Sequence, residues 1–295
     1  DVAFMSWFMP TLNPASVGEY QEFGEYGFAL SRFSGTWVGF KAISETVESG
    51  QSVDLHADRV FEQPVFTGPQ GGLHVRKSDL PSPEIETRIE HKLNAVEAFV
   101  EANPIDRRIY DIADARFGIV TTGKGHLDLM EALRLLGLDE EKCRTLGIDI
   151  YKVGMVWPLA RRDALAFVRG KEEVLVVEEK RGIIESQFKE YFYGWPGDKP
   201  QKMVGKHRAA GDPLLPWTGE FSPLELVPVV AERLAHFFPQ EGFVAKAKAL
   251  TEKPPLLLKV DGATRTPYFC SGCPHNTSTK LPHGSQAASG IGCHV

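Results

Sequence analysis

The residues best suited to chemistry are three cysteines near the carboxyl end of the sequence. Cys270 and Cys273 are separated by two residues, and Cys293 follows in a second glycine-rich stretch. Thiolates at this spacing can turn toward one metal ion or cluster, because Gly272 relieves the tight bend and leaves backbone N–H groups free to face sulfur. The pattern therefore predicts a sulfur-ligated metal centre in residues 265–295.

Spacing alone leaves three explanations of these cysteines open. A 4Fe–4S cluster needs four ligands, normally thiolates, so it would need a fourth partner elsewhere. A zinc site could be closed by Cys270, Cys273 and Cys293 together with His294 or His275. The third explanation is a loop in which the cysteines occur by coincidence, and it is the weakest because all three lie among glycines.

Composition excludes several classes of protein. The 295 residues suffice for about two domains of ~150 residues, and the hydrophobic and charged fractions, 42% and 24%, are those of ordinary globular proteins. A net charge of −6 gives no footprint for nucleic acid. No apolar run approaches the ~20 residues of a membrane helix, and four cysteines in such a chain are too few for a disulfide scaffold. We expect a cytoplasmic protein that binds neither nucleic acid nor membrane.

The elements that would position this chemistry are clearest in the middle of the sequence. Short β-branched runs alternate there with amphipathic stretches, which is typical of a doubly wound parallel sheet in the α/β class. The predicted strands are 116–122, 147–153 and 171–178, and the predicted helices are 126–136, 158–169 and 182–193. In the first of these helices Leu127, Met130, Leu133 and Leu136 are predicted to face inward. The carboxyl edge of the sheet would carry the turns 121–125, 154–158 and 178–182.

The flanking segments are predicted in less detail. We expect strands at 2–9 and 37–43 around a helix at 16–32, in which Ser16 and Glu19 form a capping box. A proline- and glycine-rich link at 50–83 precedes a helix that Pro83 opens and Asn103 ends. Further elements are a helix at 222–238 capped by Ser222 and Glu225, a short helix ending near 253, and a strand at 256–267.

Other polar motifs are weaker signals. The turn Thr121–His126 (TTGKGH) could bind an anion through Lys124 and the helix N-terminus, but it lacks the P-loop spacing, so a structural strand-to-helix turn is the better interpretation. The charges of 178–181 are interpreted as a solvated or interface cluster, and Arg107, Arg108, Arg161 and Arg162 as surface residues. Cys143 is expected to be a half-buried small residue.

Both ends of the sequence lead us to expect a piece of a longer polypeptide. Asp1 stands where an initiator methionine would, the first residues are apolar, and the sequence stops two residues after Cys293. We therefore expect the chain by itself to be inactive.

The segments CSGCPH (270–275) and SGIGCH (289–294) resemble the opening of the thiamine-diphosphate-binding domain in 2-oxoacid:ferredoxin oxidoreductases. The wider sequence resembles the long, fused form of indolepyruvate ferredoxin oxidoreductase, and the stretches FGIVTTGKGHLDLMEALRLLG and VGMVWPL support this. The resemblance extends over the whole chain. It implies the carboxyl end of a pyrimidine-binding domain at 1–65, a linker and helix at 66–104, a transketolase C-terminal-like domain at 105–253, and the start of the diphosphate-binding domain at 254–295.

The resemblance also implies roles for residues of the cysteine segment. Cys270, Cys273 and Cys293 match the family's ligands to the 4Fe–4S cluster nearest thiamine. Gly272, Pro274, His275 and Gly292 match positions that border the cofactor. The family uses thiamine diphosphate with Mg²⁺, and we assign no catalytic acid or base, because the glutamate and the Mg²⁺ ligands of the family have no match in this sequence.

The activity that the resemblance implies is oxidative decarboxylation of a 2-oxoacid. CoA would take the acyl group as co-substrate, ferredoxin would take the electrons, and the full-length chain would form a homodimer. The alternative class is a non-enzymatic scaffold or interaction module with a structural zinc site at Cys270, Cys273 and Cys293.

Overall fold

The computed structural model describes residues 1–54, 59–79, 82–252 and 269–286. The chain divides into two compact units, Asp1–Lys253 and Pro254–Val295. None of the helices in the described ranges is both long and apolar enough to cross a membrane.

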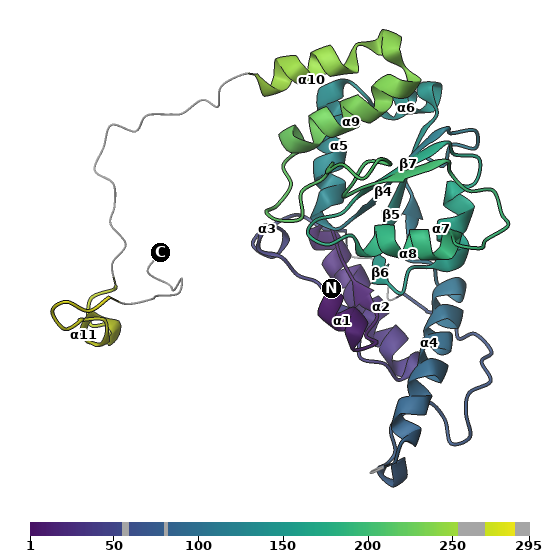
Figure 1. The fold of residues 1–295 in the computed structure, drawn as a ribbon. Helices are drawn as coiled ribbons and strands as arrows, with labels where there is room; N and C mark the ends of the chain where they lie inside the picture. Colours follow the sequence, from purple (N-terminus) through teal and green to yellow (C-terminus); the bar gives the residue numbers. More distant parts are fainter. Residues whose placement is uncertain (55–58, 80–81, 253–268, 287–295) are drawn as a thin grey trace. The chain divides into compact units, whose positions relative to one another are not determined.

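The first unit is built on a five-stranded sheet with strand order β3-β5-β4-β7-β8 (Figure 1). The central strands β5, β4, β7 and β8 run parallel, and β3 pairs antiparallel with β5 at one edge. This confirms the α/β class with a parallel sheet; the two edge strands, β3 and β8, were not predicted. The strands span Arg107–Arg108 (β3), Phe117–Thr122 (β4), Ile148–Val153 (β5), Glu173–Val177 (β7) and Lys202–Val204 (β8).

Helices cover both faces of this sheet, as Figure 1 shows. One core lies between the sheet and α5, α6, α9 and α10, and a second lies between the sheet and α7 and α8. Strands buried on both faces explain why the predicted runs are continuously apolar instead of alternating. The helices span Lys124–Leu136 (α5), Glu140–Leu146 (α6), Arg161–Val168 (α7), Ile183–Phe192 (α8), Pro223–Phe237 (α9) and Phe243–Thr251 (α10), with a 3₁₀ turn at Pro239–Glu241 (η2).

Two predictions within this region are wrong in detail. Leu127 is 46% exposed, whereas Leu136 is 2% exposed; nine residues are two and a half helical turns, so the two side chains point in opposite directions. Helix α7 begins at Arg161 and not at Pro158, because the preceding residues form a short strand, β6 (Met155–Trp157), before the helix starts. The Trp157–Pro158 peptide bond is cis.

The amino-terminal part of the unit packs through a second, three-stranded sheet with order β2-β1-β6. Strand β1 pairs parallel with β2 and antiparallel with β6, which ties this part to the larger sheet. A separate core is formed by α2, α4 and β1. The elements span Val2–Ser6 (α1), Thr11–Leu12 (β1), Val17–Ser34 (α2), Gly39–Phe40 (β2), Ser44–Val47 (α3), Lys77–Asp79 (η1) and Glu84–Ala102 (α4).

The predicted strand at 2–9 is wrong, because residues 2–6 form a helix with no buried side chain. A short apolar run cannot be assigned to strand or helix by periodicity alone. The predicted strand at 37–43 is reduced to two residues, β2. The predicted helix at 16–32 is confirmed as α2, and Pro83 and Asn103 flank α4 as predicted.

Of the two predicted capping boxes, one forms. Ser222 and Glu225 cap α9 reciprocally. Ser16 has N-cap backbone geometry but no side-chain cap, and the Glu19 carboxylate accepts from the backbone N–H of Ala15 instead. Glu19 does not complete the cap because its carboxylate also pairs with Lys152 of β5.

In the second unit the described residues, 269–286, contain one short helix, α11 (His275–Ser278). The strand predicted at 256–267 lies outside the described residues.

Candidate functional site

The cysteine segment forms a tight turn between its first two cysteines. The backbone N–H of Cys273 donates to the carbonyl of Cys270 at 3.0 Å, and Gly272 has a φ of +79°, in the left-handed region that favours glycine. Cys270 is exposed and Cys273 is half-buried. The glycine predicted to relieve the bend therefore does so, and both thiols belong to one turn.

Pro274 and His275 continue this turn into α11. Pro274 is the N-cap of α11. The Nδ1 atom of His275 lies 3.3 Å from Cys273 Sγ, and its ring stacks on Phe269 with centroids 5.3 Å apart. The structure therefore brings together five of the seven predicted site residues, Cys270, Gly272, Cys273, Pro274 and His275. Gly292 and Cys293 lie outside the described residues.

The hydrogen-bond donors of this turn fit a metal centre or cluster that is bound through cysteine sulfur. Within the described residues, the backbone N–H groups of Ser271 and Gly272 have no acceptor, and N–H groups beside cysteine are the donors that tune iron–sulfur clusters. A Cβ atom at Gly272 would meet nothing within 4 Å, so the turn is open on that side. No group of three or more metal-ligating side chains occurs among the residues that the structure places.

The second concentration of polar side chains lies at the carboxyl ends of β4, β5 and β7. The connection after β4 runs to β5 on one side, and the connection after β7 runs to β8 on the other side. The strand order therefore reverses between β4 and β7, which is where doubly wound sheets bind ligands. Here the amino-terminal part of the chain enters that position: Asn13 Nδ2 donates to Thr122 Oγ1 at 3.2 Å. The remaining cavity, lined by these residues together with Lys41, Lys124 and Glu178, has a volume of about 10 Å³.

Contacts with neighbouring protein groups fix the turn that follows β4. Lys124 Nζ donates to Asp128 Oδ2 at 2.7 Å and to the carbonyl of Phe221 at 2.5 Å. Gly123 has a φ of +52°, and a Cβ atom there would lie 2.5 Å from the Asn13 side chain. These contacts support the structural interpretation of Thr121–His126 over an anion site.

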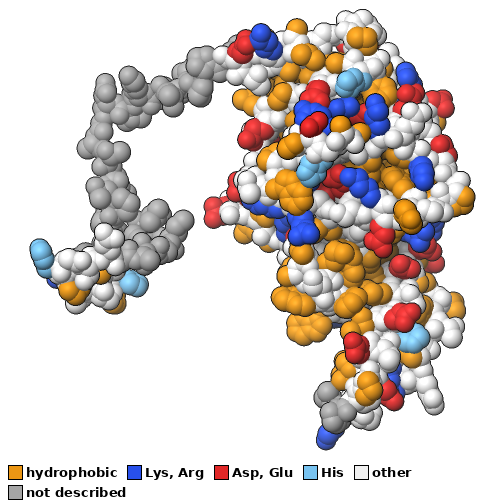
Figure 2. Space-filling view, viewed as in Figure 1, with side chains coloured by type: hydrophobic (Ala, Val, Ile, Leu, Met, Phe, Trp, Pro, Cys, Tyr) orange, Lys and Arg blue, Asp and Glu red, His pale blue; other side chains and the backbone are white. Residues whose placement is uncertain are grey.

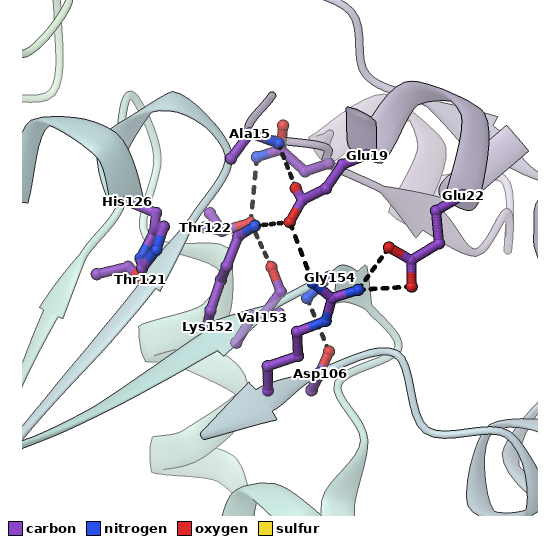
Figure 3. Close-up of polar contacts among 12 residues, drawn as sticks. Ala15, Glu19, Glu22, Asp106, Thr121, Thr122, His126, Lys152, Val153 and Gly154 are labelled. Carbon is purple, nitrogen blue, oxygen red and sulfur yellow. Dashed lines mark hydrogen bonds and ion pairs between the residues drawn. The ribbon is translucent and has the colours of Figure 1, made fainter. Parts of the chain in front are cut away.

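A buried ion pair joins α2 to the end of β5 (Figure 3). Lys152 Nζ donates to Glu19 Oε1, and the two residues are 5% and 7% exposed. Glu19 Oε2 accepts from the Ala15 N–H at 2.7 Å, and Arg107 lies 3.9 Å from Glu19 while donating to Glu22 at 2.6 Å. Burial lowers the pKa of Lys152, and the Glu19 carboxylate opposes that shift.

Two further titratable groups adjoin this pair. His126 is 8% exposed, and its Nδ1 lies 3.0 Å from Thr121 Oγ1. Burial, reinforced by Lys152, lowers the pKa of His126 to about 4, so the imidazole is neutral at pH 7. Asp106 accepts from Tyr151 Oη at 2.7 Å and from the Gly154 N–H at 2.8 Å, and burial raises its pKa to about 6.

Glu178 corrects the prediction of a solvated charge cluster at 178–181. It is 4% exposed and accepts from three consecutive backbone N–H groups at the start of α8, at 2.9–3.0 Å. Its carboxylate thus occupies the helix N-terminus that would otherwise favour an anionic ligand. Burial raises its pKa to about 7. Cys143 is also more buried than predicted, at 0% exposure.

Comparison with known proteins finds similarity to one family. A family model described as the indolepyruvate oxidoreductase domain matches residues 107–253. The indolepyruvate oxidoreductase subunit IorA of Pyrococcus abyssi is 27% identical over 303 residues, covering 97% of this chain and 42% of that protein. IorA of Pyrococcus horikoshii is 27% identical over 283 residues, covering 92% of this chain and 39% of that protein. Residues 107–253 therefore belong to the indolepyruvate oxidoreductase domain family. The chain spans about two fifths of the length of these curated relatives.

Two solved structures are distant matches. One is a 2-oxoglutarate:ferredoxin oxidoreductase from Magnetococcus marinus, with 2-oxoglutarate, coenzyme A and succinyl-CoA bound, at 17% identity and a TM-score of 0.34 over 68% of this chain and 33% of that one. The other is a split-gene transketolase at 15% identity and a TM-score of 0.29 over 49% and 42%. The α/β fold class of this chain rests on its own strand order and pairing.

Sequence reasoning missed the buried ion pair. Lys152 ends an apolar strand and Glu19 opens an amphipathic helix, so each was assigned to its own element. The available signal was a lysine in a run otherwise predicted to be buried on both faces, since such a charge needs a partner.

Proposed function

We propose that this chain forms part of a thiamine diphosphate- and iron–sulfur-dependent enzyme. The enzyme would decarboxylate a 2-oxoacid, for which indolepyruvate is the favoured substrate, and would pass electrons to ferredoxin and the acyl group to CoA. The observation that carries this proposal is the open turn of Cys270 and Cys273 in a chain that contains an indolepyruvate oxidoreductase domain.

The residues of the cysteine segment would divide the cofactor contacts. Cys270, Cys273 and Cys293 would hold a 4Fe–4S cluster, and the free N–H groups of the turn would donate to its sulfur atoms. Gly272, Pro274, His275 and Gly292 would border thiamine diphosphate, which binds with Mg²⁺. When bound, thiamine supplies a sink for the electron pair released by decarboxylation, and the cluster supplies a one-electron acceptor.

The sheet unit would contribute a scaffold. Its carboxyl edge is filled by protein groups, as the Asn13 and Glu178 contacts show, so we assign it no catalytic acid or base. The activity would therefore need parts of the enzyme besides these 295 residues, and we expect this chain alone to turn over no 2-oxoacid.

A structural zinc site is the second candidate, and one contact favours it. Cys273 Sγ lies 3.3 Å from His275 Nδ1, so a Cys270, Cys273, Cys293 and His275 set would match the mixed ligands that zinc accepts. A protein with such a site would be a scaffold or interaction module.

Metal analysis of the full-length protein, purified without oxygen, distinguishes an iron–sulfur cluster from a structural zinc site. We expect about four iron atoms per cluster, visible charge-transfer absorbance, and loss of both in Cys270→Ser and Cys273→Ser. Cys143→Ser, at a buried position of the first unit, is the matched control and should keep its iron. One equivalent of zinc with no iron would overturn the iron–sulfur assignment.

Activity is tested separately. The full-length enzyme should reduce ferredoxin with indolepyruvate only when CoA and thiamine diphosphate are present. CoA-dependent reduction of ferredoxin by the 295-residue chain alone would show that the active site is assigned to the wrong part of the protein.

A further inference from the structure

A cavity of about 290 Å³ lies between the carboxyl-terminal half of α4 and the start of α7. Four apolar side chains that line it are almost fully buried, Val100 at 3%, Met155 at 1%, Leu159 at 3% and Leu165 at 8% exposure. The polar residues at the carboxyl edge of the sheet line a different cavity. The volume is at the lower end of the range for small-molecule sites, ~300–1,000 Å³, so this cavity suits a molecule of amino-acid size better than a nucleotide cofactor.

Hydrogen bonds from α8 fix one wall of this cavity. The backbone N–H of Leu159 donates to Gln187 Oε1 at 2.8 Å, and the carbonyl of Leu159 accepts from Tyr191 Oη at 3.0 Å. Gln187 is 4% exposed and also donates to the carbonyl of Val156 at 2.8 Å. The segment between β6 and α7 is therefore held in one shape by the protein, and a preformed site loses less entropy when a ligand binds.

Two side chains of opposite charge line the cavity and have no partner of their own. Arg161 is exposed, and its guanidinium carbon lies 5.1 Å from the ring centre of Tyr191. Glu97 is exposed on α4. Across the described ranges of the chain, neither side chain forms an ion pair or a hydrogen bond. Burial raises the pKa of Tyr191 to about 12, and Glu97 adds to this rise while Arg161 opposes it, so both charges act near the same hydroxyl.

The other charged side chains of this cavity are already paired. Arg162 donates to Asp163 Oδ1 at 3.0 Å and to the carbonyl of Glu101 at 3.1 Å, and it lies 3.9 Å from the Glu101 carboxylate. Among the residues that the structure places here, one cation and one anion therefore remain available to a ligand. On the face shown in Figure 2, side chains of both charges lie where α7 meets the end of α4, whereas hydrophobic side chains gather over α1 and α2.

We propose that this cavity binds an α-amino acid with a large apolar side chain. Arg161 binds its carboxylate, Glu97 binds its ammonium group, and its side chain enters the apolar interior beside Met155 and Leu159. A guanidinium can hold a carboxylate through two parallel N–H bonds, and hydrogen bonds between ionised groups are roughly twice as strong as neutral ones. A ligand of a single charge would leave either Arg161 or Glu97 without a partner, whereas a zwitterion satisfies both.

The ammonium group separates this ligand from the substrates of the proposed reaction. A 2-oxoacid carries a carbonyl oxygen where the amino acid carries its ammonium group, so it can satisfy Arg161 but not Glu97. Transamination converts an amino acid into the 2-oxoacid with the same side chain. The site therefore senses the precursor of the substrate; this role rests on the proposed function, but the binding itself does not.

Calorimetric titration of the full-length protein with L-phenylalanine and L-leucine tests the site. Both should bind saturably, whereas glycine, which has no side chain to fill the cavity, should not. 3-Phenylpropionate and 2-phenylethylamine each lack one of the two charges, so each should bind about tenfold more weakly than L-phenylalanine or worse. Phenylpyruvate should not displace L-phenylalanine, because it lacks the ammonium group.

Two surface substitutions assign the binding to this cavity. Arg161→Gln and Glu97→Gln should each raise the dissociation constant of L-phenylalanine about tenfold or more. Arg161→Gln should leave the weak binding of 2-phenylethylamine unchanged, because that probe has no carboxylate to lose. The matched controls are Arg144→Gln, at an exposed arginine paired with Glu140, and Glu86→Gln, at an exposed position of α4. Both controls should bind L-phenylalanine as the parent protein does.

Three results would overturn the proposal. They are the absence of saturable binding for both amino acids at millimolar concentrations, binding that neither Arg161→Gln nor Glu97→Gln weakens, and displacement of L-phenylalanine by an equal concentration of phenylpyruvate. All three are measured without turnover. A failure of amino-acid binding therefore leaves the proposed oxidoreductase activity standing, and a failure of ferredoxin reduction leaves the amino-acid site standing.

Discussion

The carboxyl edge of the sheet and the cysteine turn both collect side chains capable of chemistry, but they differ in how those side chains are satisfied. At the edge, Glu19, Lys152 and Glu178 are each at most 7% exposed and bonded to protein groups. In the turn, Cys270 is exposed and two N–H groups have no acceptor among the described residues. Residue type alone therefore does not locate a functional site, because the polar side chains at the sheet edge already bond to other protein groups and stabilise the fold.

The difference has an energetic cause. A buried charge or amide costs several kcal/mol if it has no partner, so the polar groups at the edge must pair within the protein. An exposed thiol has water as its alternative and can remain unpaired until a ligand binds. Substitutions at the edge should therefore reduce stability, whereas substitutions in the turn should remove a bound group.

The largest effect is expected from Lys152→Met. It leaves the Glu19 carboxylate buried without its cation and should lower the free energy of unfolding by about 3–5 kcal/mol. Urea unfolding followed by circular dichroism measures this change.

The double variant Glu19→Gln with Lys152→Met sharpens the same test. It removes both charges, and its unfolding free energy should lie closer to that of the parent. Arg144→Ala, which breaks the exposed pair with Glu140, should change stability by no more than about 0.5 kcal/mol. Equal losses in Lys152→Met and Arg144→Ala would contradict the burial argument.

The second effect is a pH dependence carried by Glu178. Its folded-state pKa of about 7 exceeds that of an unfolded glutamate, about 4.3. Between these values the folded chain holds a proton that the unfolded chain has released, so stability falls as pH rises through this window and is level above it. The contribution is about 4 kcal/mol.

Glu178→Gln should remove this part of the pH profile. Unfolding free energies measured from pH 4.5 to pH 8, parent minus variant, should slope downward and then level off near pH 7. Glu172→Gln, at an exposed glutamate paired with Arg116, should keep the slope of the parent. Parallel profiles for the parent and Glu178→Gln would place the titration on another group.

The third effect concerns the contact between Asn13 and the turn after β4. Gly123→Ala adds a methyl group 2.5 Å from the Asn13 side chain at a φ of +52°, so it should cost about 1–3 kcal/mol. Adding Asn13→Ala should relieve the clash but leave the backbone strain in place. Gly72→Ala isolates the strain, because its φ is +85° and its Cβ would meet nothing within 4 Å. If Gly123→Ala lowers the free energy of unfolding no more than Gly72→Ala does, the close approach of Asn13 does not contribute to the loss.

The parallel sheet could be predicted from the sequence because strand, turn and helix signals agree there. Strands β4, β5 and β7 are β-branched runs that glycine turns separate from amphipathic helices, and all three were placed within two residues. Residues 2–9 were misassigned, because a short apolar run carries no period that separates strand from helix.

The site could be predicted only where its residues are adjacent in sequence. Gly272 and the two cysteines around it form one local turn, so their geometry follows from their spacing. The Glu19–Lys152 pair joins residues 133 positions apart, and no local pattern contains that contact. The same Ser-x-x-Glu spacing formed a capping box at Ser222 but not at Ser16, because only Glu19 has a buried lysine within reach.

The smallest effect on stability is expected from Cys270→Ala with Cys273→Ala in the metal-free protein. Both side chains lie in an open turn, so the free energy of unfolding should change by no more than about 0.5 kcal/mol, in contrast to the loss at Lys152. In the metal-loaded protein the same variant should lose its bound metal completely. A loss above 1 kcal/mol without metal would mean that the thiols already support the fold, and the contrast between the two regions would then fail, because the cysteines would be structural groups like those at the sheet edge.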